Sequence, residues 1–191
     1  MRPQLSPTDL HDFNHVYGDP PEVGLFSDLM AVHELAHLYH AQSGFWFPQR
    51  WLSELFANLA LEGWVREREP ASLPALRTVP RCFATIDSTR FAVTALERMD
   101  QALDARPDGP IIYAWYQCTL HCRARRVWDA AGPGVLAGLH ERFRDSPPVT
   151  DLRAFLVADL DPVFGAVIDA WPSSAPRAPD AGESGGPDRT R

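Results

Sequence analysis

Apolar residues recur every three to four positions over most of the chain, and Pro and Gly interrupt this pattern at intervals. Such spacing is typical of amphipathic helices, which bury one stripe of side chains. The pattern predicts helices over residues 27–43, 48–69, 87–105, 111–131, 135–143, 151–160 and 162–171. The expected fold is therefore mostly α: a single helical domain with at most a vestigial strand near the N-terminus.

Capping residues mark several of these boundaries. Ser27 is the expected N-cap of the first helix, and Asp87 and Thr150 are expected to cap two later ones, because their side chains can accept a bond from a free backbone N–H. Gly44 and Gly132 follow the last periodic residues of two helices, where glycine commonly stops a helix.

Three segments lack a helical pattern. Residues 1–24 carry several prolines and are expected to form an irregular lead-in, and residues 70–86 are expected to form a Pro-punctuated loop. Residues 172–191 contain no large apolar side chain to offset the entropy lost on ordering, so the sequence predicts a disordered tail. One helical domain over residues 25–171 remains.

Composition restricts the classes of function. The 191 residues carry a net charge of −7. A protein that binds nucleic acid or an anionic membrane needs a basic face, so this charge argues against both kinds of binding. No apolar run reaches the roughly 18 residues of a spanning helix, and the first residues do not form a secretory signal. Three cysteines are too few, and odd in number, for a disulfide framework. We therefore expect a cytoplasmic protein that binds neither nucleic acid nor membrane; the sequence leaves its oligomeric state open.

The candidate chemistry lies in an HExxH pattern, HELAH, which runs from His33 to His37 on a predicted helix. Positions i and i+4 share a helix face, so both imidazoles can bind one metal ion. A second helix follows after a short link and is expected to bring Glu54 over the same face. Two histidines and a glutamate are a known ligand set for catalytic zinc. Asn58, one turn beyond Glu54, is placed to hydrogen-bond a ligand histidine.

HELAH followed by WLSELFA at residues 51–57 resembles the gluzincin metallopeptidases of the peptidase MA-like superfamily. The second segment is similar to the WLNEGFA-type segment that supplies the glutamate ligand in the aminopeptidase N group. The resemblance implies a Zn²⁺ cofactor held by His33, His37 and Glu54, with Glu34 as the general base.

The aminopeptidase N group also uses a tyrosine, further along the chain, that stabilises the oxyanion and precedes a Gly-led turn. Tyr113 and Tyr116 both lie in the corresponding region of this chain, and the resemblance does not choose between them. The segment between His37 and Glu54 is shorter than in that group, and the residues before the motif helix leave no room for its substrate-aligning sheet. Aminopeptidase activity in particular is therefore not implied.

These observations favour a zinc-dependent, metallopeptidase-like hydrolase with a peptide or protein substrate. The alternative is a catalytically silent, zinc-stabilised helical module for binding or scaffolding. A cleft-forming strand within residues 1–25 would favour the enzyme, and a disordered lead-in would favour the module. A third interpretation, a metal-free bundle with a coincidental motif, is disfavoured by Glu54 and the sequence around it.

Overall fold

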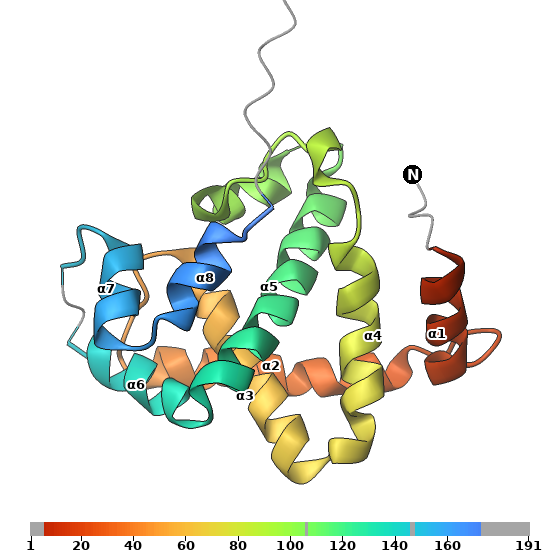
Figure 1. The fold of residues 1–191 in the computed structure, drawn as a ribbon, viewed down its shortest axis with the longest axis horizontal. Coiled ribbons are helices and arrows are strands. Elements are labelled where there is room, and N and C mark those ends of the chain that lie inside the picture. Colours follow the sequence, from red (N-terminus) through yellow and green to blue (C-terminus); the bar gives the residue numbers. More distant parts are fainter. Residues whose placement is uncertain (1–5, 106, 146–147, 173–191) are drawn as a thin grey trace, which may run out of the picture.

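The computed structural model describes residues 6–105, 107–145 and 148–172, and every regular element in these ranges is helical (Figure 1). The prediction of a mostly helical single domain is confirmed. The α-helices are α1 (Pro7–Tyr17), α2 (Gly24–Gln42), α3 (Arg50–Arg68), α4 (Leu73–Ala84), α5 (Gly109–Ala131), α6 (Gly134–Phe143), α7 (Leu152–Asp159) and α8 (Val163–Asp169). Three 3₁₀ helices join α3 to α4 and α4 to α5: η1 (Pro70–Ser72), η2 (Ser88–Arg90) and η3 (Leu96–Asp104).

The long helix α5 is the centre of the core, and α3, α4 and α8 pack against it (Figure 1). Its Trp115 and Tyr116 side chains are fully buried, and the Trp171 ring lies 5.5 Å from each of theirs. Aromatic side chains of this size bury the largest areas in a protein core. The apolar periodicity that predicts a helix over 111–131 therefore arises from packing on several sides of α5.

A short segment of residues 43–49 joins α2 to α3, which pack on one another. Gly44 ends α2 in the left-handed region, with φ of 72°, and Gly132 ends α5 in the same way, with φ of 70°. Both glycine stops agree with the prediction, since this backbone conformation strains any side chain with a β-carbon. The fully buried Phe45 fixes the link between the two helices in the core.

The prediction of an irregular lead-in over residues 1–24, with at most a strand, is wrong for its described part, which contains α1. The Ser6 hydroxyl caps this helix by accepting a hydrogen bond of 3.1 Å from the Asp9 backbone N–H. At the other end Tyr17 is buried, and its hydroxyl donates to the carbonyl of Ala75 on α4. A side-chain cap and a tertiary contact thus order a segment whose prolines indicate a loop.

Residues 70–86 also differ from the prediction, because η1 and α4 replace the expected loop. Pro74 lies in the first turn of α4, where a backbone N–H has no helical partner in any case. Pro80 lies inside the helix, where it removes one backbone bond. The helix forms nonetheless because one face, which includes Leu76 and Cys82, is buried. Packing outweighs local propensity here.

Three predicted caps are also corrected. The helix α2 begins before Ser27, with Val23 at its N-cap and no side-chain cap. Asp87 caps the short η2 rather than a long α-helix, so the expected helix over 87–105 is two 3₁₀ segments. Asp151, not Thr150, caps α7 by accepting from a backbone N–H.

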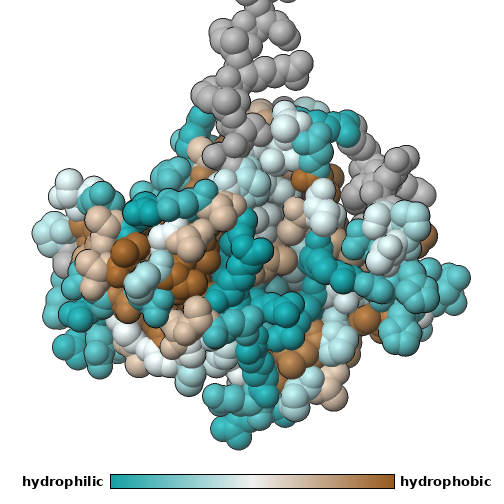
Figure 2. Space-filling model, in the orientation of Figure 1, coloured by the Kyte–Doolittle hydropathy of each residue, from teal (hydrophilic) through white to brown (hydrophobic). Residues whose placement is uncertain are grey.

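The predicted tail begins at Pro172, and its remaining residues, 173–191, lie outside the described part of the chain. Within that part no helix combines the length and the apolar character needed to cross a membrane. On the face seen in Figure 2, hydrophobic side chains gather near α7 and α8, while the surface over α1 and α4 is mostly hydrophilic.

The close approach of α3 and α5 at Gly63 predicts that this position does not tolerate a larger side chain. A β-carbon at this position would lie 2.2 Å from Cη2 of Trp128, far inside contact distance. Although alanine is the better helix former, we predict that Gly63→Ala lowers the free energy of unfolding by about 1–3 kcal/mol, measured by urea titration. Gly24→Ala is the control, because nothing lies within 4 Å of its added β-carbon. Equal stability of Gly63→Ala and the unsubstituted protein would contradict the contact.

Candidate metal centre

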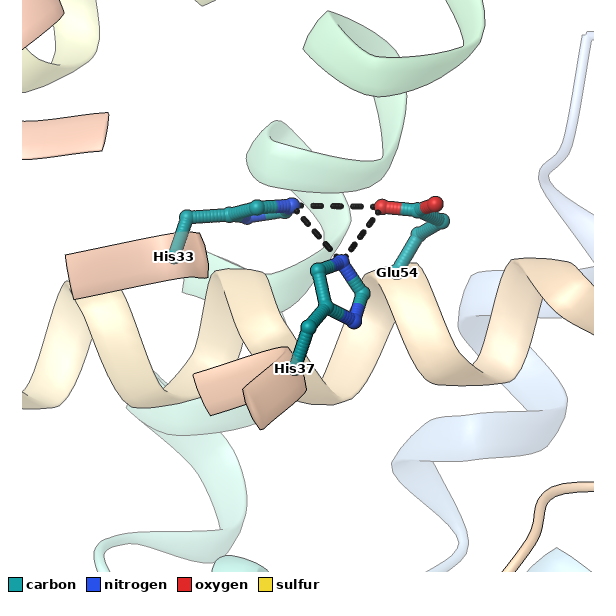
Figure 3. A group of neighbouring side chains, drawn as sticks. All are labelled: His33, His37 and Glu54. Atoms are coloured by element: carbon teal, nitrogen blue, oxygen red, sulfur yellow. Dashed lines mark hydrogen bonds and ion pairs between the residues drawn. The ribbon is translucent and has the colours of Figure 1, made fainter. Parts of the chain in front are cut away.

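The structure brings together three of the predicted site residues, His33 and His37 from α2 and Glu54 from α3 (Figure 3). Nε2 of His33 lies 3.2 Å from Oε2 of Glu54, and Nε2 of His37 lies 3.1 Å from the same oxygen. The two Nε2 atoms are 3.1 Å apart. The three atoms form a triangle in which His33 and Glu54 are buried and His37 is half-buried.

Protons alone do not satisfy this triangle. The oxygen of an ionised Glu54 only accepts, so either two Nε2–H groups face one another or an unprotonated Nε2 faces the carboxylate oxygen. A cation in contact with all three removes this conflict. In a tetrahedral zinc site with bonds of about 2.0–2.1 Å, the ligand atoms lie about 3.3–3.4 Å apart. The observed separations are only slightly shorter, so the three atoms lie close enough together to hold a metal ion.

The electrostatics of the triangle favour a charged carboxylate. Burial raises the pKa of Glu54, but hydrogen bonds from His33 and His37 outweigh this effect and hold it well below its ordinary value. The hydrogen bond to Glu54 raises the pKa of His37, against the opposing effect of burial. Glu54 therefore offers an anionic ligand atom throughout the neutral pH range.

Ser53 is a contributor that the sequence argument missed. Its hydroxyl lies 3.4 Å from Nδ1 of His37 and 3.4 Å from Nδ1 of His40. A partner on Nδ1 fixes the ring orientation of a histidine whose Nε2 faces a metal. The available signal was its position directly before Glu54, which places it on the same helical turn of α3.

The two candidate tyrosines differ in whether they contact Glu54. The Tyr113 hydroxyl donates to Oε1 of Glu54 over 3.1 Å, and Arg50 and Gln117 donate to that hydroxyl over 2.9 and 3.0 Å. Tyr116 lies in the core instead, where its hydroxyl donates to the Ala95 carbonyl over 2.7 Å. Tyr116 thus does not contact the triangle, in contrast to Tyr113, and its ring stacks on Trp171.

Glu34 is exposed on α2 next to His33 and forms no hydrogen bond or ion pair within the described part of the chain. Its charge contributes to the raised pKa of His37, so the carboxylate acts on that imidazole. Glu34 is thus an exposed carboxylate next to His33 in the chain, without a partner among the described residues.

Asn58 does not contact a ligand histidine, in contrast to the prediction. Its Nδ2 donates to the backbone carbonyl of Glu54 over 2.9 Å, and its Oδ1 lies 3.2 Å from Nδ1 of His121 on α5. The reason is that α3 turns this side chain toward α5 rather than toward α2. Asn58 therefore links α3 to α5.

Asn58 belongs to a polar seam between these two helices, in which side chains follow one another at intervals of four residues. The members on α3 are Arg50, Glu54, Asn58, Glu62 and Arg66, and those on α5 are Tyr113, Gln117 and His121. Glu62 is fully buried, and it accepts from Arg66 over 2.8 Å and from Arg77 of α4. Burial raises the pKa of Glu62, but these two guanidinium groups hold it below its ordinary value.

Comparisons of the chain with protein-family models, curated proteins and solved structures give no match. The resemblance to gluzincins therefore remains a prediction that rests on the sequence motifs HELAH and WLSELFA.

The burial of His121 in the seam predicts how folding stability depends on pH. Complete burial lowers its pKa to about 4, although the nearby Glu62 carboxylate opposes the shift. Between pH 6.5 and 4 the unfolded chain binds a proton at this residue that the folded chain does not, so folding stability falls as the pH falls. The free energy of unfolding is expected to fall between pH 7.5 and pH 4.5. We predict that this fall is smaller by about 2–3 kcal/mol in His121→Gln.

Urea unfolding of metal-stripped protein at the two pH values measures this difference. His11→Gln is the control, because His11 is exposed on α1 and its replacement is expected to leave the pH dependence unchanged. A His121→Gln variant that loses as much stability on acidification as the unsubstituted protein would refute the assignment of a neutral buried imidazole.

Proposed function

We propose that the chain is a zinc-dependent, metallopeptidase-like hydrolase that cleaves peptide bonds, with His33, His37 and Glu54 as the zinc ligands. The observation that carries this proposal is the triangle of Nε2, Nε2 and Oε2 atoms, separated by 3.1–3.2 Å and contributed by HELAH and WLSELFA. A bound zinc ion supplies Lewis acidity to a scissile carbonyl and lowers the pKa of a water molecule.

Residues around the triangle supply the remaining functions in this proposal. Glu34, an exposed carboxylate without a competing partner in the described chain, accepts a proton from the attacking water and later delivers it to the leaving amine. Tyr113 is the hydrogen-bond donor assigned to the developing oxyanion. Its hydroxyl exchanges the bond to Glu54 for one to the substrate, while Arg50 and Gln117 continue to donate to it.

The substrate in this proposal is a peptide or protein, and the compartment is the cytoplasm.

One observation favours the second candidate, a catalytically silent zinc-stabilised module. The residues before α2, in which a cleft-forming strand would support peptide alignment, instead form α1, which packs on α4. Both candidates need the same ligand set, so zinc binding does not separate them. They differ in whether Glu34 serves a reaction.

Glu34→Gln separates the two candidates. We predict that zinc-loaded protein hydrolyses members of a mixed peptide library, and that Glu34→Gln keeps its zinc but loses about 10²–10⁴-fold in rate, because the amide cannot accept the proton from water. The measurement is the rate of peptide cleavage followed by mass spectrometry, together with the zinc content of each variant.

Glu141→Gln, which removes an exposed carboxylate from α6, is the matched control and is expected to retain the full rate. Hydrolysis by Glu34→Gln at the unsubstituted rate would overturn the mechanism. Full zinc occupancy with no cleavage of any library member would favour the silent module.

A further inference from the structure

A concave surface lies between α1, α4 and α5, and none of the three candidate metal ligands lines it. Its volume of about 540 Å³ falls within the range of small-molecule sites. Four arginines line it, Arg77 and Arg81 from α4 and Arg125 and Arg126 from α5. We call this surface the arginine cleft. The surface over α1 and α4, part of its surroundings, is mostly hydrophilic (Figure 2).

The carboxylates around the arginine cleft do not balance its arginines. Asp12 pairs with Arg81 over 2.7 Å, and Asp129 is shared between Arg66 at 2.6 Å and Arg125 at 3.7 Å. The only other carboxylate in these pairs is the buried Glu62, which is itself shared by Arg66 and Arg77. Within the lining itself, four guanidinium groups accompany two carboxylates, Asp12 and Asp129, so the lining is positive on a chain whose net charge is −7.

Two groups in the arginine cleft have hydrogen-bonding capacity that the described residues leave unused. Arg126 is exposed and forms no ion pair within the described chain. Nε of Arg77 is buried, and no hydrogen-bond acceptor lies within reach of it in the described residues. A buried donor without a partner is costly unless a ligand or water supplies an acceptor.

The chemistry of these groups selects the ligand. A guanidinium group presents N–H donors in a planar fork that matches two oxygens of a phosphate or a carboxylate. The walls also include Val16, Pro74 and Cys122, which offer apolar contact to the body of a ligand. We propose that the arginine cleft binds a small anionic molecule through phosphate or carboxylate oxygens, with Arg126 and Arg81 as accessible contacts and Arg77 at the inner wall.

This site is independent of the candidate metal centre and of the hydrolase proposal. Its ligand is held by charge-assisted hydrogen bonds, and its affinity therefore falls as the salt concentration rises.

Isothermal titration calorimetry tests the proposal with two probes, pyrophosphate and citrate, at low ionic strength. The protein is stripped of metal and dialysed free of chelator, so that neither probe binds through a metal ion. We expect saturable binding of one probe molecule per chain. Arg126→Gln is expected to weaken it by at least about tenfold, and Arg81→Gln/Arg126→Gln to weaken it further. Tighter binding of pyrophosphate assigns the ligand group as phosphate, and tighter binding of citrate assigns it as carboxylate.

Arg144→Gln is the matched control, because it removes the same charge from an exposed position at the end of α6, which contributes no residue to the cleft. It is expected to leave both affinities unchanged. The proposal is overturned if neither probe binds saturably, if the double variant binds as tightly as the unsubstituted protein, or if Arg144→Gln weakens binding as much as Arg126→Gln does.

Discussion

Two carboxylates, Glu54 and Glu62, are buried on one face of α3, and the helices around α3 supply the groups that keep them charged. A buried carboxylate without partners is strongly destabilising. Glu54 has the two imidazoles of α2 on one side and the Tyr113 hydroxyl of α5 on the other. Glu62, two turns along, has a guanidinium group from α4 and another from its own helix.

This requirement relates the fold to the site. The helices α2, α4 and α5 each pack on α3 through apolar side chains, and each also contributes a polar partner to one of the two carboxylates. Asn58 lies between the carboxylates and connects the backbone at Glu54 to His121. A metal ion at the triangle would take over part of the stabilisation of Glu54. Metal binding and folding are then linked, because only the folded chain brings the three ligand atoms together.

Most helices could be predicted from the sequence, because apolar periodicity ends at strong local stops such as Gly44 and Gly132. The juxtaposition of His33, His37 and Glu54 could also be predicted, since it needs only one helical turn, a short link and a second helix. The helices α1 and α4 could not, because their prolines indicate loops while tertiary burial of Tyr17 and Leu76 stabilises helix.

The choice between Tyr113 and Tyr116 and the partner of Asn58 depend on how α5 is rotated against α3, which no local pattern specifies. The buried seam was missed for a related reason. Polar residues spaced four apart on a helix usually form a face exposed to solvent. Only the packing of α4 and α5 shows that Glu62 is buried.

The most direct test of the central claim is the zinc content of the protein, measured by elemental analysis beside that of Glu54→Ala after both are dialysed against zinc and then against buffer. The account predicts about one zinc ion per unsubstituted chain and far less in the variant, since three protein ligands are the usual minimum for a catalytic zinc site. Absence of zinc from the unsubstituted chain, or equal zinc in both proteins, would contradict the assignment of His33, His37 and Glu54 as a metal centre.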